Sequence, residues 1–336
     1  MGMMAVPTRA MCRLSVRQVC CRPVVAIVGP TAVGKSRVAV EVAKVFETEV
    51  LTADSRQVYR GMDVGTDKPA LEVRQGIPHR LIDLVNPDQS FNAGLYRRQA
   101  IDEIERLYRD NRLPLVVGGT GLYVRTLLKG LCGAPPADPI VRAALLREAK
   151  TQGHDSLYAR LVEVDPATAA RLHPRDESKV IRALEVHQLS GRRMSEFQQE
   201  HGFADRPFSS LIIGFNRDRS ALYRRIEERI DWQLAHGLIE ETQHLLIQGY
   251  QRTSAAMKGL GYRQVVEHLA GEYGVSEMAR RFKRDTRHFS KRQMTWFRKE
   301  PGIQWLTIKE RESVQHTAAL VIEKVDRFLT TLGDQG

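Results

Sequence analysis

The chain has 336 residues, of which 42% are hydrophobic and 27% charged, an ordinary composition for one large globular domain or two. Lys and Arg number 51 against 40 Asp and Glu, and the net charge of +11 is a mild bias towards a polyanionic partner. No apolar run reaches the roughly 18 residues of a membrane span. The four cysteines lack metal-site spacing, which favours a reduced, cytoplasmic setting.

Residues 1–22 differ from the rest of the chain. They contain Arg9, Arg13, Arg17 and Arg22 and no acidic residue. We predict a disordered leader, and a mitochondrial transit peptide is the alternative.

The glycine loop, Gly29–Ser36, has the full G-x-x-x-x-G-K-[ST] pattern. A continuous apolar stretch, Val24–Val28, precedes it, and residues 37–46 follow with apolar positions at helical spacing. A strand, a glycine turn and a helix direct several backbone N–H groups and a helix dipole at one point. Lys35 adds a charge there, and the Ser36 hydroxyl can ligate Mg²⁺. The sequence therefore predicts a polyphosphate site.

Two more polar residues follow predicted strands. Asp54 ends the short stretch after residue 49, and Thr120 follows Leu113–Val117 in a Gly-Gly-Thr-Gly turn. Carboxyl ends of parallel strands face one crevice, so both side chains should lie near the glycine loop. Asp54 is a candidate general base, a candidate Mg²⁺ ligand or a helix N-cap, and Thr120 is an N-cap or an active-site hydroxyl.

The remaining pattern predicts an α/β fold with a P-loop-containing parallel-sheet core, a helical insertion domain and C-terminal helices. We place the core at 23–134 and 206–336 and the insertion at 135–205, after the proline-rich boundary at 135–139. The predicted elements are a loop at 61–69, a strand at 79–85, helices at 93–110, 141–151, 156–163 and 167–172, a strand at 209–215, and long helices from 220 to about 300.

Residues 276–300 carry nine Lys and Arg against three Asp and Glu. Phe282, Phe289 and Trp296 recur every seven positions, so we expect them to share one helix face and to pack in the core. A solvated face would explain the charges, but their concentration on one helix favours a surface for nucleic-acid phosphates.

Seven motifs now resemble the tRNA dimethylallyltransferase family, in the family's order. The resemblance runs from about Val24 to Phe297, and it rests on the glycine loop, Asp54-Ser-Arg-Gln-Val-Tyr59, Gly65-Thr-Asp-Lys-Pro69, Gly118-Gly-Thr-Gly-Leu-Tyr123, Arg182-Ala-Leu-Glu-Val186, Gly261-Tyr262 and Lys291-Arg-Gln-Met-Thr-Trp-Phe297.

The resemblance implies transfer of a dimethylallyl group from dimethylallyl diphosphate to N6 of the adenosine immediately 3′ of the anticodon in tRNA. Departure of diphosphate builds negative charge, which Lys35, the loop and Mg²⁺ would stabilise. Asp54 matches the family's base, and Thr120 matches a residue beside the acceptor. Arg229 matches an arginine that closes on the diphosphate, and a solvated helix arginine in an i,i+4 pair is the alternative. We expect a monomer without a membrane partner.

The residues that the resemblance assigns fall into three groups. The diphosphate group is Gly29, Pro30, Thr31, Ala32, Val33, Gly34, Lys35 and Ser36, with Ser36 as metal ligand. The catalytic group is Asp54, Thr120, Lys35 and Arg229. The tRNA-binding group is Asp54, Ser55, Arg56, Gln57, Thr120, Arg142, Ser178, Lys179, Val180, Ile181, Arg182, Lys258, Gly259, Leu260, Gly261, Tyr262, Arg263, Lys291, Arg292, Gln293, Met294, Thr295, Trp296, Phe297 and Arg298.

Two other classes of function remain as alternatives. An adenylate prenyltransferase or a P-loop nucleotide kinase would use the same loop on a free nucleotide, and the basic helix would then be superfluous. A nucleic-acid-binding NTPase would hydrolyse ATP on RNA, but the sequence contains no clear arginine-finger or water-positioning arrangement.

Overall fold

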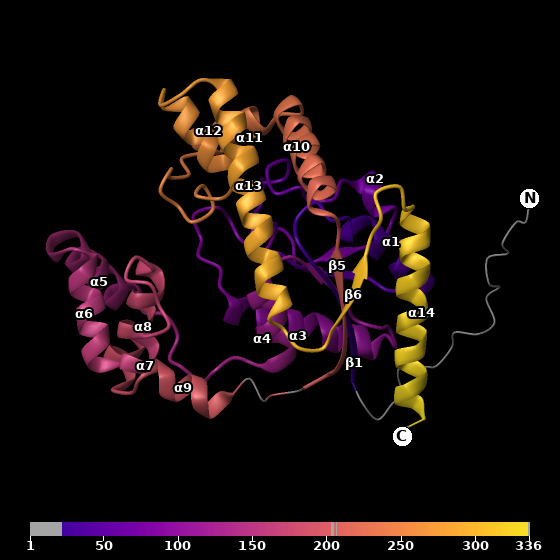
Figure 1. The fold of residues 1–336 in the computed structure, drawn as a ribbon, viewed down its shortest axis with the longest axis horizontal. Helices are drawn as coiled ribbons and strands as arrows, with labels where there is room; N and C mark the ends of the chain where they lie inside the picture. Colours follow the sequence, from indigo (N-terminus) through magenta and orange to yellow (C-terminus); the bar gives the residue numbers. More distant parts are fainter. Residues whose placement is uncertain (1–21, 203–204, 206, 335–336) are drawn as a thin grey trace, which may run out of the picture. The chain divides into compact units, whose positions relative to one another are not determined.

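The computed structural model describes residues 22–202, 205 and 207–334, which form two compact units (Figure 1). The larger unit holds the described residues of Met1–Leu128 and Pro207–Gly336, and the smaller holds those of Lys129–Arg206. Except for Arg22, the predicted leader lies outside the described residues.

The larger unit is built on a six-stranded parallel sheet in the order β3-β2-β4-β1-β5-β6. All six residues of the central strand β1 are buried, as expected for a strand covered on both faces. The predicted α/β fold class is confirmed. The strands are β1 (Pro23–Val28), β2 (Val50–Ala53), β3 (His79–Arg80), β4 (Leu115–Gly118), β5 (Ser209–Asn216) and β6 (Ile303–Thr307).

Alternate residues of β1 enter two separate cores, because side chains of a strand point to opposite faces. Val24, Ala26 and Val28 pack with α3 (Ala93–Arg109) and α4 (Gly121–Lys129). Val25 and Ile27 belong to the larger core on the other face, which α1 (Lys35–Val45) also enters. The helices that complete that core are α10 (Arg219–Ala235), α11 (Leu238–Ile247), α12 (Tyr262–Leu269), α13 (Val275–Arg298) and α14 (Val314–Gly333).

The described secondary-structure elements of the smaller unit are all helices. Its core gathers Leu145, Leu157, Leu161, Val180 and Leu184 from three helices. The sequence predicted the first three helices of this unit and missed the last two. The helices are α5 (Pro139–Gln152), α6 (His154–Val164), α7 (Pro166–Ala169), α8 (Glu177–Ser190) and α9 (Met194–His201).

The predicted strand at 79–85 is wrong beyond its first two residues. Leu81 and Asp83 have φ values of 63° and 55°, so the backbone turns away from the sheet after β3. The sequence also missed β6, whose residues are half-exposed at the sheet edge, and the short helix α2 (Leu71–Arg74). The helix predicted at 93–110 is confirmed by α3.

Candidate active site

The glycine loop joins β1 to α1 at the carboxyl edge of the sheet. Gly29 has a φ of +145°, and a Cβ there would lie 2.7 Å from the Phe215 carbonyl oxygen, so the chain needs glycine at this point. The first backbone bond into α1 runs from Val38 N to Gly34 O. The amides at the start of α1 therefore have no partner within the helix, and an anion can accept from them.

Lys35 is folded back over the loop. Its Nζ donates to Gly29 O at 3.0 Å and to Pro30 O at 2.7 Å. Burial lowers the pKa of the Lys35 ammonium from 10.5 to about 8, and the neighbouring Asp54 carboxylate acts in the opposite direction. The ammonium is thus a partly desolvated cation whose partners in this structure are mainly backbone carbonyls.

Two arginines of α10 and one glutamine of α13 hold the outer side of the glycine loop. Arg225 Nε donates to Ala32 O at 2.9 Å, and Arg229 Nη1 donates to Thr31 Oγ1 at 2.7 Å. Gln293 Oε1 accepts from Thr31 N at 2.9 Å. Arg229 Nε is buried without a partner among the described residues, so this side chain retains a free donor for an anion.

Asp54 and Thr120 lie at the ends of β2 and β4, which are hydrogen-bonded neighbours. Asp54 Oδ1 accepts from Arg56 N at 2.8 Å and caps the following turn, whereas Oδ2 has no partner among the described residues. Thr120 Oγ1 accepts from Ser55 N at 2.9 Å. The predicted helix N-cap is wrong, because residues 55–58 form a turn and no helix follows Asp54; Oδ1 caps this turn, and Oδ2 is free for chemistry.

A cavity of about 750 Å³ lies beside the glycine loop, and Thr120 is not among its lining residues. Thr31, Lys35, Ser36 and Asp54 line it, as does Arg229 from α10. Diphosphate-sized and purine-sized groups fit in this volume, which lies within the usual range for ligand pockets.

The loop 61–69 forms one wall of the cavity, and the side chains of three residues, Glu241, Gln233 and Gln57, bind its backbone. The Glu241 carboxylate accepts from the amides of Asp63, Val64 and Gly65 at 2.9, 2.8 and 3.2 Å. Gln233 Nε2 donates to Val64 O, and Gln57 Nε2 donates to Thr66 O and Asp67 O. The Tyr262 hydroxyl donates in turn to the Glu241 carboxylate.

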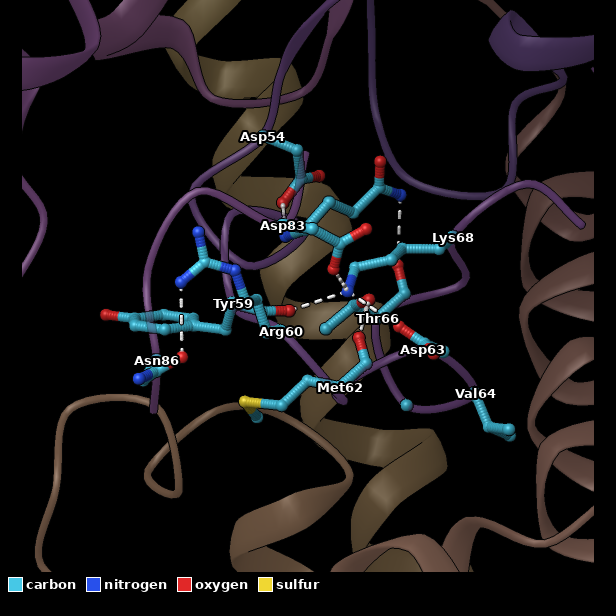
Figure 2. Close-up of polar contacts among 12 residues, drawn as sticks. Asp54, Tyr59, Arg60, Met62, Asp63, Val64, Thr66, Lys68, Asp83 and Asn86 are labelled. Atoms are coloured by element: carbon cyan, nitrogen blue, oxygen red, sulfur yellow. Dashed lines mark hydrogen bonds and ion pairs between the residues drawn. The ribbon is translucent and has the colours of Figure 1, made fainter. Parts of the chain in front are cut away.

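Lys68 ties the wall to the neighbouring segments (Figure 2). Its side chain is 3% exposed, and Nζ donates to Tyr59 O and to Asp63 and Asp83 carboxylates at 2.5–2.6 Å. A buried ammonium with three acceptors holds the loop in one conformation. Asp67, the preceding residue, accepts from Arg229 Nη1 at 3.0 Å across the cavity.

The basic residues of α13 divide into two sets. Towards the start of the helix, Arg280 and Arg281 pair with Glu277, and further cations pair with acidic residues of α10 and α13. The four cations near the end form no ion pair with any described residue, and all are exposed: Lys291, Arg292, Arg298 and Lys299. The available positive charge is therefore at the carboxyl end of the helix.

The aromatic residues of α13 behave only partly as predicted. Phe282 is buried in the core, whereas Phe289 is half-exposed. Trp296 is partly buried, and the Arg125 guanidinium lies 4.3 Å from its ring centroid. Among the side chains assigned to tRNA, Gln293, Met294 and Phe297 are buried.

Several other residues assigned to tRNA lie together in the larger unit. Arg56 Nη1 donates to Ala255 O at 2.7 Å, and its side chain lies near Gly259. Lys258 and Arg263 are exposed, but Tyr262 is 1% exposed. Burial raises the pKa of the Tyr262 hydroxyl, which donates to Glu241, so this tyrosine is an internal support of the cavity wall.

The smaller unit places Arg142 and Arg182 around one buried carboxylate. Arg142 Nη2 and Arg182 Nη1 donate to Glu185 Oε2 at 2.8 and 2.7 Å. Ser178 and Lys179 are exposed, whereas Val180 and Ile181 are core residues of this unit.

The sequence assigned no role to Asp67, Lys68, Gln233 or Glu241. Asp67 and Lys68 belong to a quoted motif, so the motif was the available signal for them. Glu241 and Gln233 sit on amphipathic helices, where nothing in the spacing separates a carboxylate that accepts three amides from a solvated one.

Fold and site together define a parallel α/β protein with an anion-directed glycine loop, a nearby carboxylate and a basic helix. The sequence profile of the family described as IPP transferase matches residues 57–300. This chain belongs to that family. It is 47% identical over 284 residues to the tRNA dimethylallyltransferase 2 of Geotalea uraniireducens (strain Rf4), covering 84% of this chain and 92% of the relative.

Solved structures are similar over most of the chain. The tRNA isopentenylpyrophosphate transferase of Bacillus halodurans is 34% identical with a TM-score of 0.71, covering 94% of this chain and 99% of that one. A eukaryotic dimethylallyltransferase, solved in crystallographic snapshots of its action on tRNA, is 25% identical with a TM-score of 0.77, covering 91% of this chain and 80% of that one. None of the described helices combines the length and apolar character needed to cross a membrane.

Proposed function

We propose that this chain transfers a dimethylallyl group from dimethylallyl diphosphate to N6 of the adenosine immediately 3′ of the anticodon in tRNA. The observation that carries the proposal is that Lys35, Asp54 and Arg229 line one cavity beside the glycine loop. One bond breaks between the allylic carbon and the diphosphate oxygen, and one bond forms between that carbon and N6. The N6 proton leaves to a base.

The glycine loop holds the diphosphate leaving group. Negative charge grows on the diphosphate oxygens as the allylic bond breaks, and donors already in place stabilise it. The unpaired amides at the start of α1, the Lys35 ammonium and the free Nε donor of Arg229 supply this stabilisation. The reaction involves no phosphoryl transfer, so the role of the loop is to bind the diphosphate leaving group.

Magnesium fits this donor set. Ser36 and Asp54 both line the cavity, and Mg²⁺ in phosphate sites takes one or two protein oxygens together with ligand phosphates and water. When bound, the ion would neutralise part of the diphosphate charge. Ser36 is the residue that we assign to it.

Asp54 is the group that we assign to the N6 proton. The amine lone pair is delocalised into the purine ring, so attack needs proton removal as the new bond forms. Oδ1 is held by backbone amides, and Oδ2 is the oxygen available to accept the proton. The Thr120 hydroxyl accepts from the amide of Ser55, the residue that follows Asp54.

The acceptor is proposed to be an extruded base of tRNA. The unpaired cations of α13 suit the phosphates of an RNA strand, and an adenine must leave its stack to reach a cavity of this kind. The family relatives named as tRNA-modifying enzymes support the same acceptor.

Mass spectrometry of nucleosides tests the proposal. Purified protein is incubated with Mg²⁺, dimethylallyl diphosphate and either an unmodified tRNA transcript or AMP. We expect adenosine in the transcript to gain one dimethylallyl group and AMP to remain unchanged. Modification of AMP with an unmodified transcript would favour the adenylate prenyltransferase alternative.

A further inference from the structure

Gln293 of α13 joins two turns of the candidate site. Its Oε1 accepts from Thr31 N, and its Nε2 donates to Gly119 O, both at 2.9 Å. The residue is 8% exposed, although it stands between exposed cations of a strongly basic helix. One carboxamide therefore satisfies one donor of the glycine loop and one acceptor of the turn after β4.

The turn after β4 is shaped to receive this carboxamide. A Cβ on Gly119 would lie 2.4 Å from Gln293 Nε2, so any larger residue would displace the amide. Both hydrogen bonds have good length, and a buried amide that lost them would leave two backbone groups unsatisfied. The pairing of Gly119 with Gln293 is thus specific to these residue types.

The held amide is the one at the start of the loop. Thr31 N is fixed by Gln293, and Thr31 Oγ1 accepts from Arg229, so this residue is held from α13 and α10. The amides that lack helical partners lie a few residues further on, at the start of α1. A fixed Thr31 limits the conformations of the segment between it and Lys35.

We propose that Gln293 is a positioning residue for diphosphate binding. By fixing Thr31 and Gly119 it keeps the glycine loop in the anion-binding conformation before the ligand arrives, which reduces the ordering cost of binding. The identity of the anion rests on the proposed function. The assignment replaces tRNA contact as the role of this one residue of the 291–298 segment.

The test measures the Kd of inorganic diphosphate by calorimetry, with Mg²⁺, for the wild type and for Gln293→Met, which keeps the length of the side chain and removes both hydrogen bonds. We expect affinity to fall about tenfold, equivalent to about 1.4 kcal/mol. Gln243→Met, at an exposed glutamine of α11, is the matched control and should bind as the wild type does. A Kd within twofold of wild type for Gln293→Met would overturn the proposal.

Gly119→Ala disrupts the same contact, because its Cβ would displace the Gln293 carboxamide. Because both changes break one carboxamide contact, the double variant should bind about as weakly as the weaker single variant. Multiplied effects of the two changes would contradict action through a shared contact. Amide exchange of Thr31, followed by mass spectrometry of peptides, should be faster in Gln293→Met than in wild type.

The same measurements distinguish a purely structural role of Gln293 from a failure of the proposed function. A merely structural role would lower the melting temperature of Gln293→Met and leave the Kd of the folded protein unchanged, which contradicts positioning. A wild-type protein that binds diphosphate but makes no prenylated adenosine would contradict the proposed function, and the Kd comparison would still decide the role of Gln293.

Discussion

The Arg229 guanidinium on α10 donates to the Asp67 carboxylate at 3.0 Å, and both residues line the cavity. Asp67 lies on the loop that Lys68 and Glu241 hold, so the carboxylate is presented to the arginine by a fixed wall. An anion that binds in the glycine loop therefore has to compete with Asp67 for this guanidinium.

Asp67→Asn should tighten diphosphate binding about two- to fivefold, since a half-exposed ion pair contributes about 0.2–1 kcal/mol. Asparagine tolerates the φ of +56° at this position, so the wall should keep its shape. Calorimetry with inorganic diphosphate measures the effect. Glu310→Gln removes an equal charge from a distant surface pair and serves as control. Weaker binding by Asp67→Asn would show that Asp67 does not compete with the ligand.

Asp54→Asn should lower kcat by about 10²–10⁴-fold and leave tRNA affinity nearly unchanged. The amide oxygen can still cap the turn at Arg56, but the side chain can no longer take the N6 proton. Single-turnover prenylation measures the rate, with Asp231→Asn, a surface partner of Lys283, as control. Wild-type turnover in Asp54→Asn would remove this residue from the base role.

Diphosphate affinity should weaken as the pH rises through about 8, where the Lys35 ammonium loses its proton. Because burial depresses this pKa, the cation is present below about 8 and absent well above it, and the loss approaches about tenfold per pH unit until the pKa of the complex is reached. Calorimetry in metal-free buffer is the measurement. Lys35→Arg keeps its charge and reports the titration of diphosphate itself, so equal pH profiles for the two proteins would contradict the prediction.

Replacing Lys291 and Arg292 with alanine should flatten the dependence of tRNA binding on salt. Each lost phosphate contact lowers the slope by about 0.7–0.9. Filter binding at several salt concentrations gives the slope. Arg280 and Arg281 already pair with Glu277, so their double alanine variant should change the slope less. The reverse order of the two effects would place the RNA on the other half of α13.

Glu49 should make the protein sensitive to acid. Burial alone would raise the pKa of this carboxyl, but hydrogen bonds from Arg80 and Arg106 outweigh it and lower the pKa. The stabilisation is therefore present above about pH 4.5 and is lost as the pH falls through the lowered value. Glu49→Gln should lower the free energy of unfolding by about 1–3 kcal/mol near neutral pH, with a smaller difference in acid.

Urea unfolding at two pH values measures this effect. Glu323→Gln, in an exposed pair with Arg327, is the control and should change the free energy of unfolding by less than about 0.5 kcal/mol. A Glu49→Gln deficit that grows in acid would contradict the sign of the argument.

The sequence predicted the parts of the fold that follow from uninterrupted apolar patterns. Buried β1 and amphipathic α3 carry such patterns, and both lie where expected. The edge strand β6 is half-exposed, and the segment after Arg80 turns through left-handed residues, so neither follows from periodicity. The sequence expectation that Asp54, Thr120 and the glycine loop share an edge agrees with their positions at adjacent strand ends.

The sequence could not predict the contacts of long polar side chains. The family resemblance of the 291–298 segment placed Gln293 with the RNA-binding residues, but its side chain points to the glycine loop. Arg280 and Arg281 counted as available charge, although each pairs with Glu277. Which partner a flexible polar side chain chooses depends on tertiary contacts that no local pattern records.

The stoichiometry of one reaction tests the central claim most directly. Purified protein, Mg²⁺, dimethylallyl diphosphate and an unmodified anticodon stem-loop are combined without ATP, and released diphosphate and prenylated adenosine are counted together. We predict equal amounts of the two products. Two results together would contradict the claim that the glycine loop binds the diphosphate leaving group. They are unmodified adenosine in this reaction, and RNA-stimulated hydrolysis of ATP when ATP replaces dimethylallyl diphosphate.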